Sequence, residues 1–401
     1  MARSAKINKW LEIATIVVCI LAPTVATVYC FKLTQGAEFS QYYAIGRLIK
    51  AGAYNQIYDA NAVQGMERIL GLNPVHGHSI FIVPPIISWV FYPLPFLNFQ
   101  QAFYLWTFIL AVAALASFLM LCRNLGLSGI KRAWLAVLLG AMGSFVLSIS
   151  EGYLIPLLLL ALVGLFANLK KRNFLMASIY QSLFWLQPQL MLPLLCFELG
   201  IGQIYTVTIT SLLAVIGLLI SFLIGGFGIV KVWYQLFFQQ MHNWSGGLAD
   251  CTLQGQLLRF TLHRDLANQI AIAAFFILMV AVFVIGKRVK AKQWQLNILL
   301  TAVLPLSLVL SLRSSSQDLL LLFPGIVSLM LMSINSWLKY VRALLIMITL
   351  AILLLPLDML INCNAIEKSV YNPFFWLTII FALCALIIEK HSKTQNANGD
   401  V

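Results

Sequence analysis

Long apolar segments separated by short polar stretches run along the whole chain. A helix needs about 20 apolar residues to cross a bilayer, and the segments meet this length repeatedly. The pattern predicts an all-α polytopic membrane protein with about 12 transmembrane helices. The continuous spans are expected at about 10–31, 101–121, 132–149, 153–169, 204–228, 267–286, 294–311, 318–335, 342–361 and 373–388.

Two apolar segments are interrupted and do not fit the length of a simple span. Residues 79–99 contain four prolines and are predicted to be interfacial or re-entrant. Residues 173–200 contain Gln187-Pro188-Gln189 at their centre and are predicted to form two short half-spans that meet at Pro188. Polar groups at such a break need a cavity that is lined by protein or wet.

The charge pattern orients the chain. Only 10% of residues are charged, 61% are hydrophobic, and the net charge is +13. Most basic residues form short runs between apolar segments, such as Lys170-Lys171-Arg172, and cytoplasmic loops are typically basic. We therefore expect both termini in the cytoplasm, an uncleaved first helix and no nucleic-acid partner.

One membrane domain is expected over 1–390, followed by a disordered cytoplasmic tail over 391–401. Its large outer loops are predicted at 34–99 and 229–266, the second opening after Gly225-Gly226. The cysteines lack metal-ligand spacing, and the His76-x-His78 pair has no acidic or cysteine partner nearby, so no metal site is predicted.

The first outer loop holds the strongest candidate for chemistry. Residues Gly36 to Asp59 are predicted to contain a short helix that stops at Gly52. On this helix Glu38 and Tyr42 are four residues apart and share a face. A carboxylate beside tyrosines just outside a membrane is a candidate catalytic group.

Other polar residues near the outer ends of the spans are expected to face the same side. Ionisable groups at membrane depth are costly and often functional. The predicted substrate-binding residues are Tyr42, Tyr43, Glu151, Gln187, Gln189, Arg259, Arg264, Arg313 and Asp318.

Four blocks, in this order, resemble glycosyltransferase family 87, whose members are membrane enzymes that use polyprenyl-phosphate sugars. The blocks are EFSQYYAIGRLIKAGAYNQIYD, VPPIISWVFYPLPFLNFQQAFYLW, SISEGYLIPLLLLALVGLFANLKKRNFLMASIYQSLFWLQPQ and LSLRSSSQDLLLLFP. Together they cover roughly residues 30–330.

The resemblance implies a GT-C-type helical bundle whose site faces the outer side of a membrane, here expected to be a bacterial inner membrane. The donor would be a lipid-linked sugar, with mannose as one candidate, and the acceptor a lipid-linked or exported cell-envelope glycan. Glu38 falls at the family's acidic position, which implies that it is the general base. Arg313, Arg259 and Arg264 would then stabilise the phosphate that leaves. No cofactor is implied.

The chain departs from the family pattern at three places. Glu38 stands where Asp is usual, Gln187 where Lys is usual, and Val83-Pro84-Pro85 where Tyr-Pro-Pro is usual. Three functions stay open: a divergent glycosyltransferase, a non-catalytic relative that binds lipid-linked glycan, and a transporter or flippase of lipid-linked sugars. A transporter should show paired broken helices in both halves, and only the break at Pro188 is visible.

Overall fold

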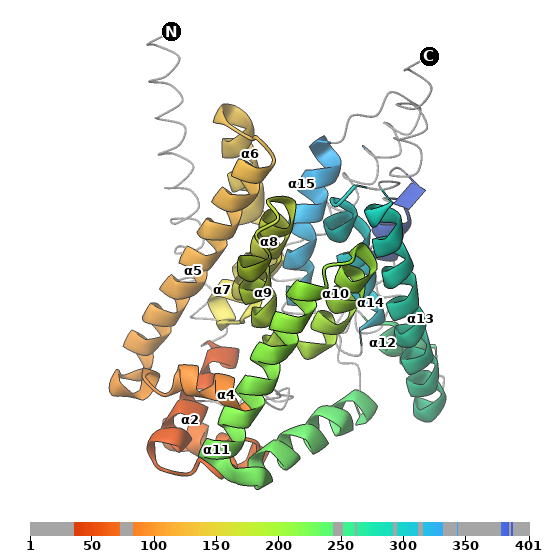
Figure 1. The fold of residues 1–401 in the computed structure, drawn as a ribbon. Helices are drawn as coiled ribbons and strands as arrows, with labels where there is room; N and C mark the ends of the chain where they lie inside the picture. The colour runs from red at the N-terminus through yellow and green to blue at the C-terminus, as the bar shows by residue number, and fades with distance from the viewer. Residues whose placement is uncertain are drawn as a thin grey trace, which may run out of the picture.

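Every secondary-structure element that the structure describes is a helix (Figure 1). In this computed structural model the described residues are 36–72, 83–243, 252–260, 263–291, 295–311, 316–331, 343, 378–384 and 386–387. The predicted all-α class is confirmed for this part of the chain.

Among the described residues, three helices are long and apolar enough to cross a membrane. They are α5 (Phe99–Asn124), α11 (Ile204–Asn243) and α13 (Arg264–Lys290). A fourth candidate is the pair formed by α6 (Gly129–Ala141) and α7 (Gly143–Glu151), which bends by 59°. The protein is therefore a membrane protein.

The count of about twelve spanning helices stays a prediction. The helices expected at 10–31 and 342–361 lie outside the described residues, apart from Ala343. The single helix expected at 132–149 is instead the bent pair α6 and α7. Gly140 and Gly143 flank the bend at Met142, and glycine lowers helix propensity.

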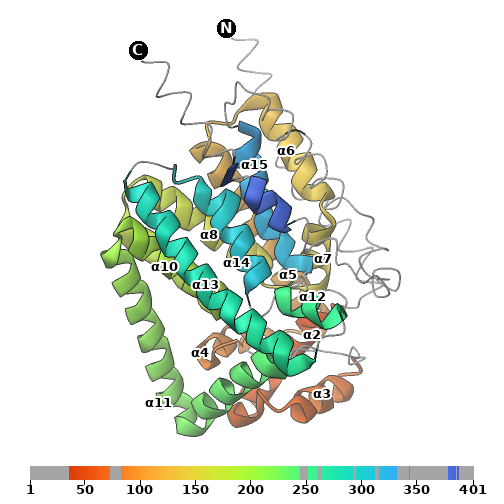
Figure 2. The ribbon, with the colours of Figure 1, turned by 90° about the vertical axis from the view of Figure 1, so that its right-hand side faces the viewer.

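The predicted half-spans are present as short helices that meet at Gln187. The first is α9 (Phe174–Ser182) with its continuation η4 (Leu183–Leu186), and the second is α10 (Pro188–Ile201). Pro188 starts α10, where its missing N–H costs nothing. Figure 1 shows α9 beside α8 (Ile155–Lys170), and Figure 2 shows α10 beside α13.

Several short helices cover one end of the bundle, which we call the α2 end (Figure 2). They are α2 (Ala37–Lys50), η1 (Tyr54–Gln56), α3 (Ala60–Ile69), α4 (Pro85–Ser88), η2 (Trp89–Phe91) and η3 (Leu94–Phe96). The proline-rich stretch 85–96 is too short to cross a membrane.

Hydrogen bonds hold these short helices together. The hydroxyls of Tyr58 and Tyr54 donate to the carbonyls of Val83 and Pro85, at 2.7 Å and 2.8 Å. Asp59 caps α3 by accepting from the Asn61 N–H at 2.9 Å. The cap places Asp59 in a structural role.

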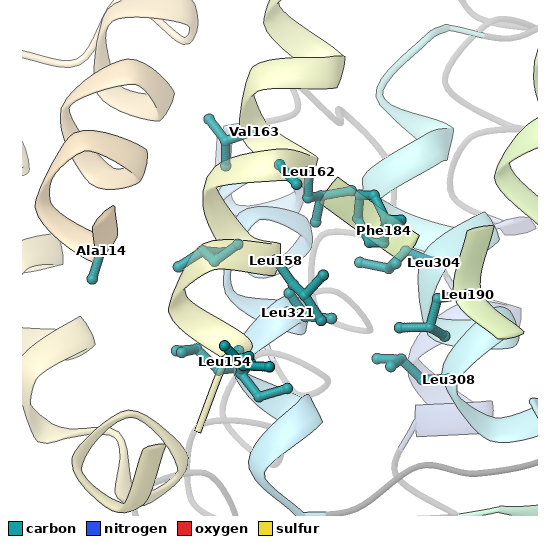
Figure 3. Close-up of a cluster of buried hydrophobic side chains, with 14 of the residues drawn as sticks. Ala114, Leu154, Leu158, Leu162, Val163, Phe184, Leu190, Leu304, Leu308 and Leu321 are labelled. Carbon is teal, nitrogen blue, oxygen red and sulfur yellow. The ribbon is translucent and has the colours of Figure 1, made fainter. Parts of the chain in front are cut away.

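The core of the bundle is a cluster of buried leucines and phenylalanines (Figure 3). It lies between α8, α10, η4, α14 (Leu304–Leu310) and η6 (Ser316–Leu322). The π-helical turn η5 (Leu299–Val303) precedes α14, and α15 (Phe323–Leu331) follows η6. In a membrane such helices associate by close packing, because lipid tails are as apolar as leucine.

The described parts of the second predicted outer loop, 229–266, are largely helical. The helix α11 does not end at Gly225-Gly226 but bends there and continues to Asn243, because Gly226 takes a positive φ of 71°. Beyond the bend the helix buries Ile229 and Trp233. A further short helix, α12 (Leu253–Arg259), lies within the same stretch.

The contact between α10 and α13 yields a test of the packing. A Cβ at Gly200 would lie 2.3 Å from the carbonyl oxygen of Phe283 and 2.9 Å from the Cα of Gly286. We expect Gly200→Ala to lower the free energy of unfolding in detergent by about 1–3 kcal/mol through overpacking. Gly228→Ala is the matched control, because nothing lies within 4 Å of its Cβ position. Equal stability of the two variants would contradict the packing.

Candidate active site

The helix α2 forms where the sequence predicts it and holds an aromatic face against α5. Gly36 precedes it with a φ of 63°, and a Cβ there would lie 2.9 Å from the Phe103 ring. Phe39 packs against the rings of Phe103 and Trp106 at centroid distances of 5.3 Å and 6.4 Å. The first turn of α2, which carries Glu38, is therefore fixed against the start of α5.

Glu38 and Tyr42 share a face of α2, as predicted. The Tyr42 hydroxyl donates to Oε1 of Glu38 at 3.3 Å. The Tyr42 ring is buried and stacks on Phe91, with a centroid distance of 4.6 Å and an interplanar angle of 5°. A rigid phenol thus orients a carboxylate that is only partly buried.

Glu151 lies on the neighbouring turn between α7 and α8. It ends α7, and Gly152 follows with a φ of 84°. The indole N–H of Trp106 donates to the Gly152 carbonyl at 2.9 Å. A Cβ at Gly152 would lie 2.8 Å from the Cβ of Phe39. The Glu151 turn and the Glu38 turn are therefore in direct contact.

Tyr153 is a tyrosine next to Glu151, and its hydroxyl is buried. Its side chain interacts with Glu151 at hydrogen-bonding range, and Glu38 and Tyr42 lie within electrostatic range of it. Burial, followed by the charges of Glu151 and Glu38, raises the pKa of the Tyr153 hydroxyl. The hydroxyl therefore stays protonated and can donate a hydrogen bond.

A second pair of predicted residues meets at the break between the half-spans. The Gln187 amide Nε2 donates to Oδ1 of Asp318 at 3.0 Å, across 131 positions of sequence. Asp318 lies in the first turn of η6 and is buried. Gln189 is also buried. The Oε1 atom of Gln187 is buried and accepts no hydrogen bond from the described residues.

The remaining predicted residues are placed differently. Tyr43 is buried, and its hydroxyl donates to the Leu97 carbonyl at 2.9 Å, so it fastens α2 to the segment before α5. Arg259 ends α12 and is partly buried, whereas Arg264 begins α13 and is exposed. Arg313 lies outside the described residues.

The structure adds residues that the sequence interpretation missed. Trp106 binds the Gly152 turn, Tyr153 interacts with Glu151, and Glu67 is a buried carboxylate that accepts from the Ser40 hydroxyl at 2.6 Å. The sequence offered one sign of Tyr153, its position two residues after Glu151. It offered no sign that Ser40 pairs with Glu67, because the two residues are 27 positions apart.

The comparisons with known proteins now decide the family. The model of Glycosyltransferase family 87 matches residues 81–311. The chain belongs to glycosyltransferase family 87. The matched segment includes Glu151, Gln187, Arg259 and Arg264. Glu38 and Asp318 lie outside it. No curated protein and no solved structure matches the chain significantly.

Membership of family 87 makes the chain a glycosyltransferase, which acts on a sugar donor and an acceptor. In the part of the chain that the structure describes, no group of three or more His, Cys, Asp or Glu side chains could hold a metal ion. That the enzyme needs no metal or cofactor stays a prediction.

Gly152 yields a test of how the site is assembled. Gly152→Ala should cost about 1–2 kcal/mol of stability from the left-handed backbone, and its Cβ should also displace Phe39 and reduce glycosyl transfer. Gly52→Ala is the control, because Gly52 has a φ of 78° but nothing within 4 Å of its Cβ position. We expect the control to lose stability only, measured by unfolding and transfer assays on the same preparations. Equal rates of glycosyl transfer by both variants would show that the contact between Gly152 and Phe39 does not position the catalytic groups.

Proposed function

We propose that this family 87 member moves a sugar from a polyprenyl-phosphate donor to a lipid-linked or exported glycan, with Glu38 as general base. Mannose is one candidate sugar. The enzyme would have a GT-C-type bundle in a bacterial inner membrane, with the α2 end on the outer face and both termini in the cytoplasm. The observation that supports this most is the contact between the Glu38 turn and the Glu151 turn at that end.

The proposed step is a displacement at the anomeric carbon. An acceptor hydroxyl oxygen forms the new glycosidic bond while the bond from the anomeric carbon to the phosphate oxygen breaks. The electron pair of that bond leaves with the lipid phosphate, and the hydroxyl proton passes to the Glu38 carboxylate. Tyr42 holds the carboxylate in place through its hydrogen bond at 3.3 Å.

The leaving phosphate needs positive groups as its charge develops. Arg259 and Arg264 are the described candidates, and Arg313 is the third. Arg259 is tied to the bundle through α12, whose Gln254 bonds to Asn268 of α13. A charge-assisted bond from such an arginine to a phosphate oxygen would favour departure of the lipid.

Polar side chains at the break are proposed to bind the sugar. Gln187 and Asp318 are already paired at 3.0 Å, and the side-chain oxygen of Gln187 accepts no hydrogen bond from the described residues. Gln189 lies beside them at the break, and Glu151, on the turn between α7 and α8, is proposed to contact the sugar as well. Neutral amides and carboxylates that bind each other can also bind sugar hydroxyls, since each hydroxyl both donates and accepts.

Substitution of Glu38 tests the proposed base. We expect Glu38→Gln to lower the transfer rate by about 10²–10⁴-fold, because the amide cannot take the proton. The assay follows radiolabelled sugar from undecaprenyl-phosphate hexoses (mannose, glucose and galactose donors) into membrane glycans. Asp59→Asn is the matched control, since asparagine caps α3 as well as aspartate does, and it should transfer normally.

The outcomes separate the competing functions. Normal transfer by Glu38→Gln with loss in Glu151→Gln would move the base to Glu151. Sugar movement across the membrane without any new glycosidic bond would favour a transporter. A wild-type chain that binds these donors and transfers none would favour a non-catalytic relative.

A further inference from the structure

The last turn of α2 presents two cations toward the segment that leads into α5. Arg47 and Lys50 are three residues apart and therefore share a side of the helix. The Arg47 guanidinium lies 5.5 Å from the Tyr43 ring centroid and donates to its hydroxyl at 3.3 Å. The Lys50 ammonium lies 4.1 Å from the Phe96 ring centroid and donates to the Pro95 carbonyl at 3.3 Å.

Within the described ranges, these two cations contact no acidic partner. The groups that Arg47 and Lys50 contact there are rings, a hydroxyl and a carbonyl. The Nε of Arg47 is buried and has no hydrogen-bond acceptor among the described residues. A guanidinium has five N–H donors, and among the described residues Arg47 uses one of them, through Nη2. Its side chain is half-buried, so the N–H groups on the exposed part are the ones that an anion can reach.

The position of both cations is fixed by close backbone packing. A Cβ at Gly46 would lie 2.3 Å from the Phe91 carbonyl oxygen and 3.0 Å from the Cδ of Pro95. The Tyr43 hydroxyl adds a bond to the Leu97 carbonyl at 2.9 Å. An anion that binds here meets side chains that are already held in place.

The surroundings place this cation pair at a membrane boundary. The spanning helix α5 starts beside it with exposed Gln100 and Gln101, and its next exposed positions are apolar, including Phe108 at 65% exposure. Phe96 and Val90 are also exposed, at 62% and 56%. Aromatic and basic residues together are typical of the headgroup region of a bilayer.

This surface differs from the candidate active site. Arg47 follows Glu38 by nine residues, which is about two and a half turns of helix. The two side chains therefore leave α2 on opposite sides. A phosphate bound between Arg47 and Lys50 would not be the one that leaves the sugar.

We propose that Arg47 and Lys50 bind the phosphate of an anionic phospholipid from the surrounding bilayer, with Phe96 and Val90 against its acyl chains. Arginine and lysine form charge-assisted hydrogen bonds with phosphate oxygens. The bound lipid fastens the end of α2 to the membrane.

Lipid binding by the full-length protein in detergent tests the site. We expect phosphatidylglycerol to raise the unfolding temperature of the wild type more than phosphatidylcholine does. In Arg47→Gln/Lys50→Gln this difference should vanish, and the apparent affinity for phosphatidylglycerol should fall about 25-fold, at about fivefold for each basic residue. The double variant Arg68→Gln/Lys231→Gln is the control, since both side chains are exposed at other sites, and it should bind as the wild type does.

Further arms identify the source of the phosphate and check the fold. Soluble glycerol phosphate should give no stabilisation, and an effect as large as that of the lipid would overturn the lipid assignment. The charge-preserving variant Arg47→Lys/Lys50→Arg should keep the preference for phosphatidylglycerol. Loss of the preference in this variant while it remains folded, or full binding by the glutamine variant, would overturn the site.

Discussion

The contact between the aromatic face of α2 and the start of α5 is the interaction on which the candidate site depends. Phe39 fits between the rings of α5 and the Gly152 turn, and Trp106 binds that turn through its indole N–H. Gly152 has no side chain, so the two turns can touch. Without this packing, Glu38 and Glu151 would belong to unconnected parts of the chain.

The proposed sugar site needs polar groups inside an apolar bundle, and Gln187 and Asp318 are two such groups that bond to each other. The break at Gln187 places a polar side chain inside the bundle, while the backbone N–H and carbonyl of Gln187 bond to Phe184 and Leu190. Asp318 accepts a hydrogen bond from Gln187, so the buried carboxylate has a partner. The short helices α9 and α10 therefore bring polar side chains inside the bundle, and close packing, as at Gly200 and Gly286, keeps the helices together.

Family membership and side-chain geometry contribute different parts of the functional interpretation. The family match over residues 81–311 makes the chain a glycosyltransferase. The proposed base, Glu38, lies before the matched segment and rests on its contacts with Tyr42 and the Glu151 turn. Gln187, where the family resemblance implies lysine, forms a hydrogen bond with Asp318 and adds no positive charge. We therefore expect hydrogen bonds from Gln187 and Asp318, and no positive charge at this position, to select the sugar.

The sequence by itself determined the helical class, the membrane location, the short helix with Glu38 and Tyr42 on one face, and the break at Pro188. These features depend on apolar length, i to i+4 spacing and proline, which act over a few neighbouring residues. Only the tertiary structure decided that Gln187 meets Asp318, that Glu67 binds Ser40, and that Tyr43 fastens α2. It also decided that α11 bends at Gly226 and continues as a helix. Such pairings depend on how distant helices pack, and no local spacing in the chain encodes that packing.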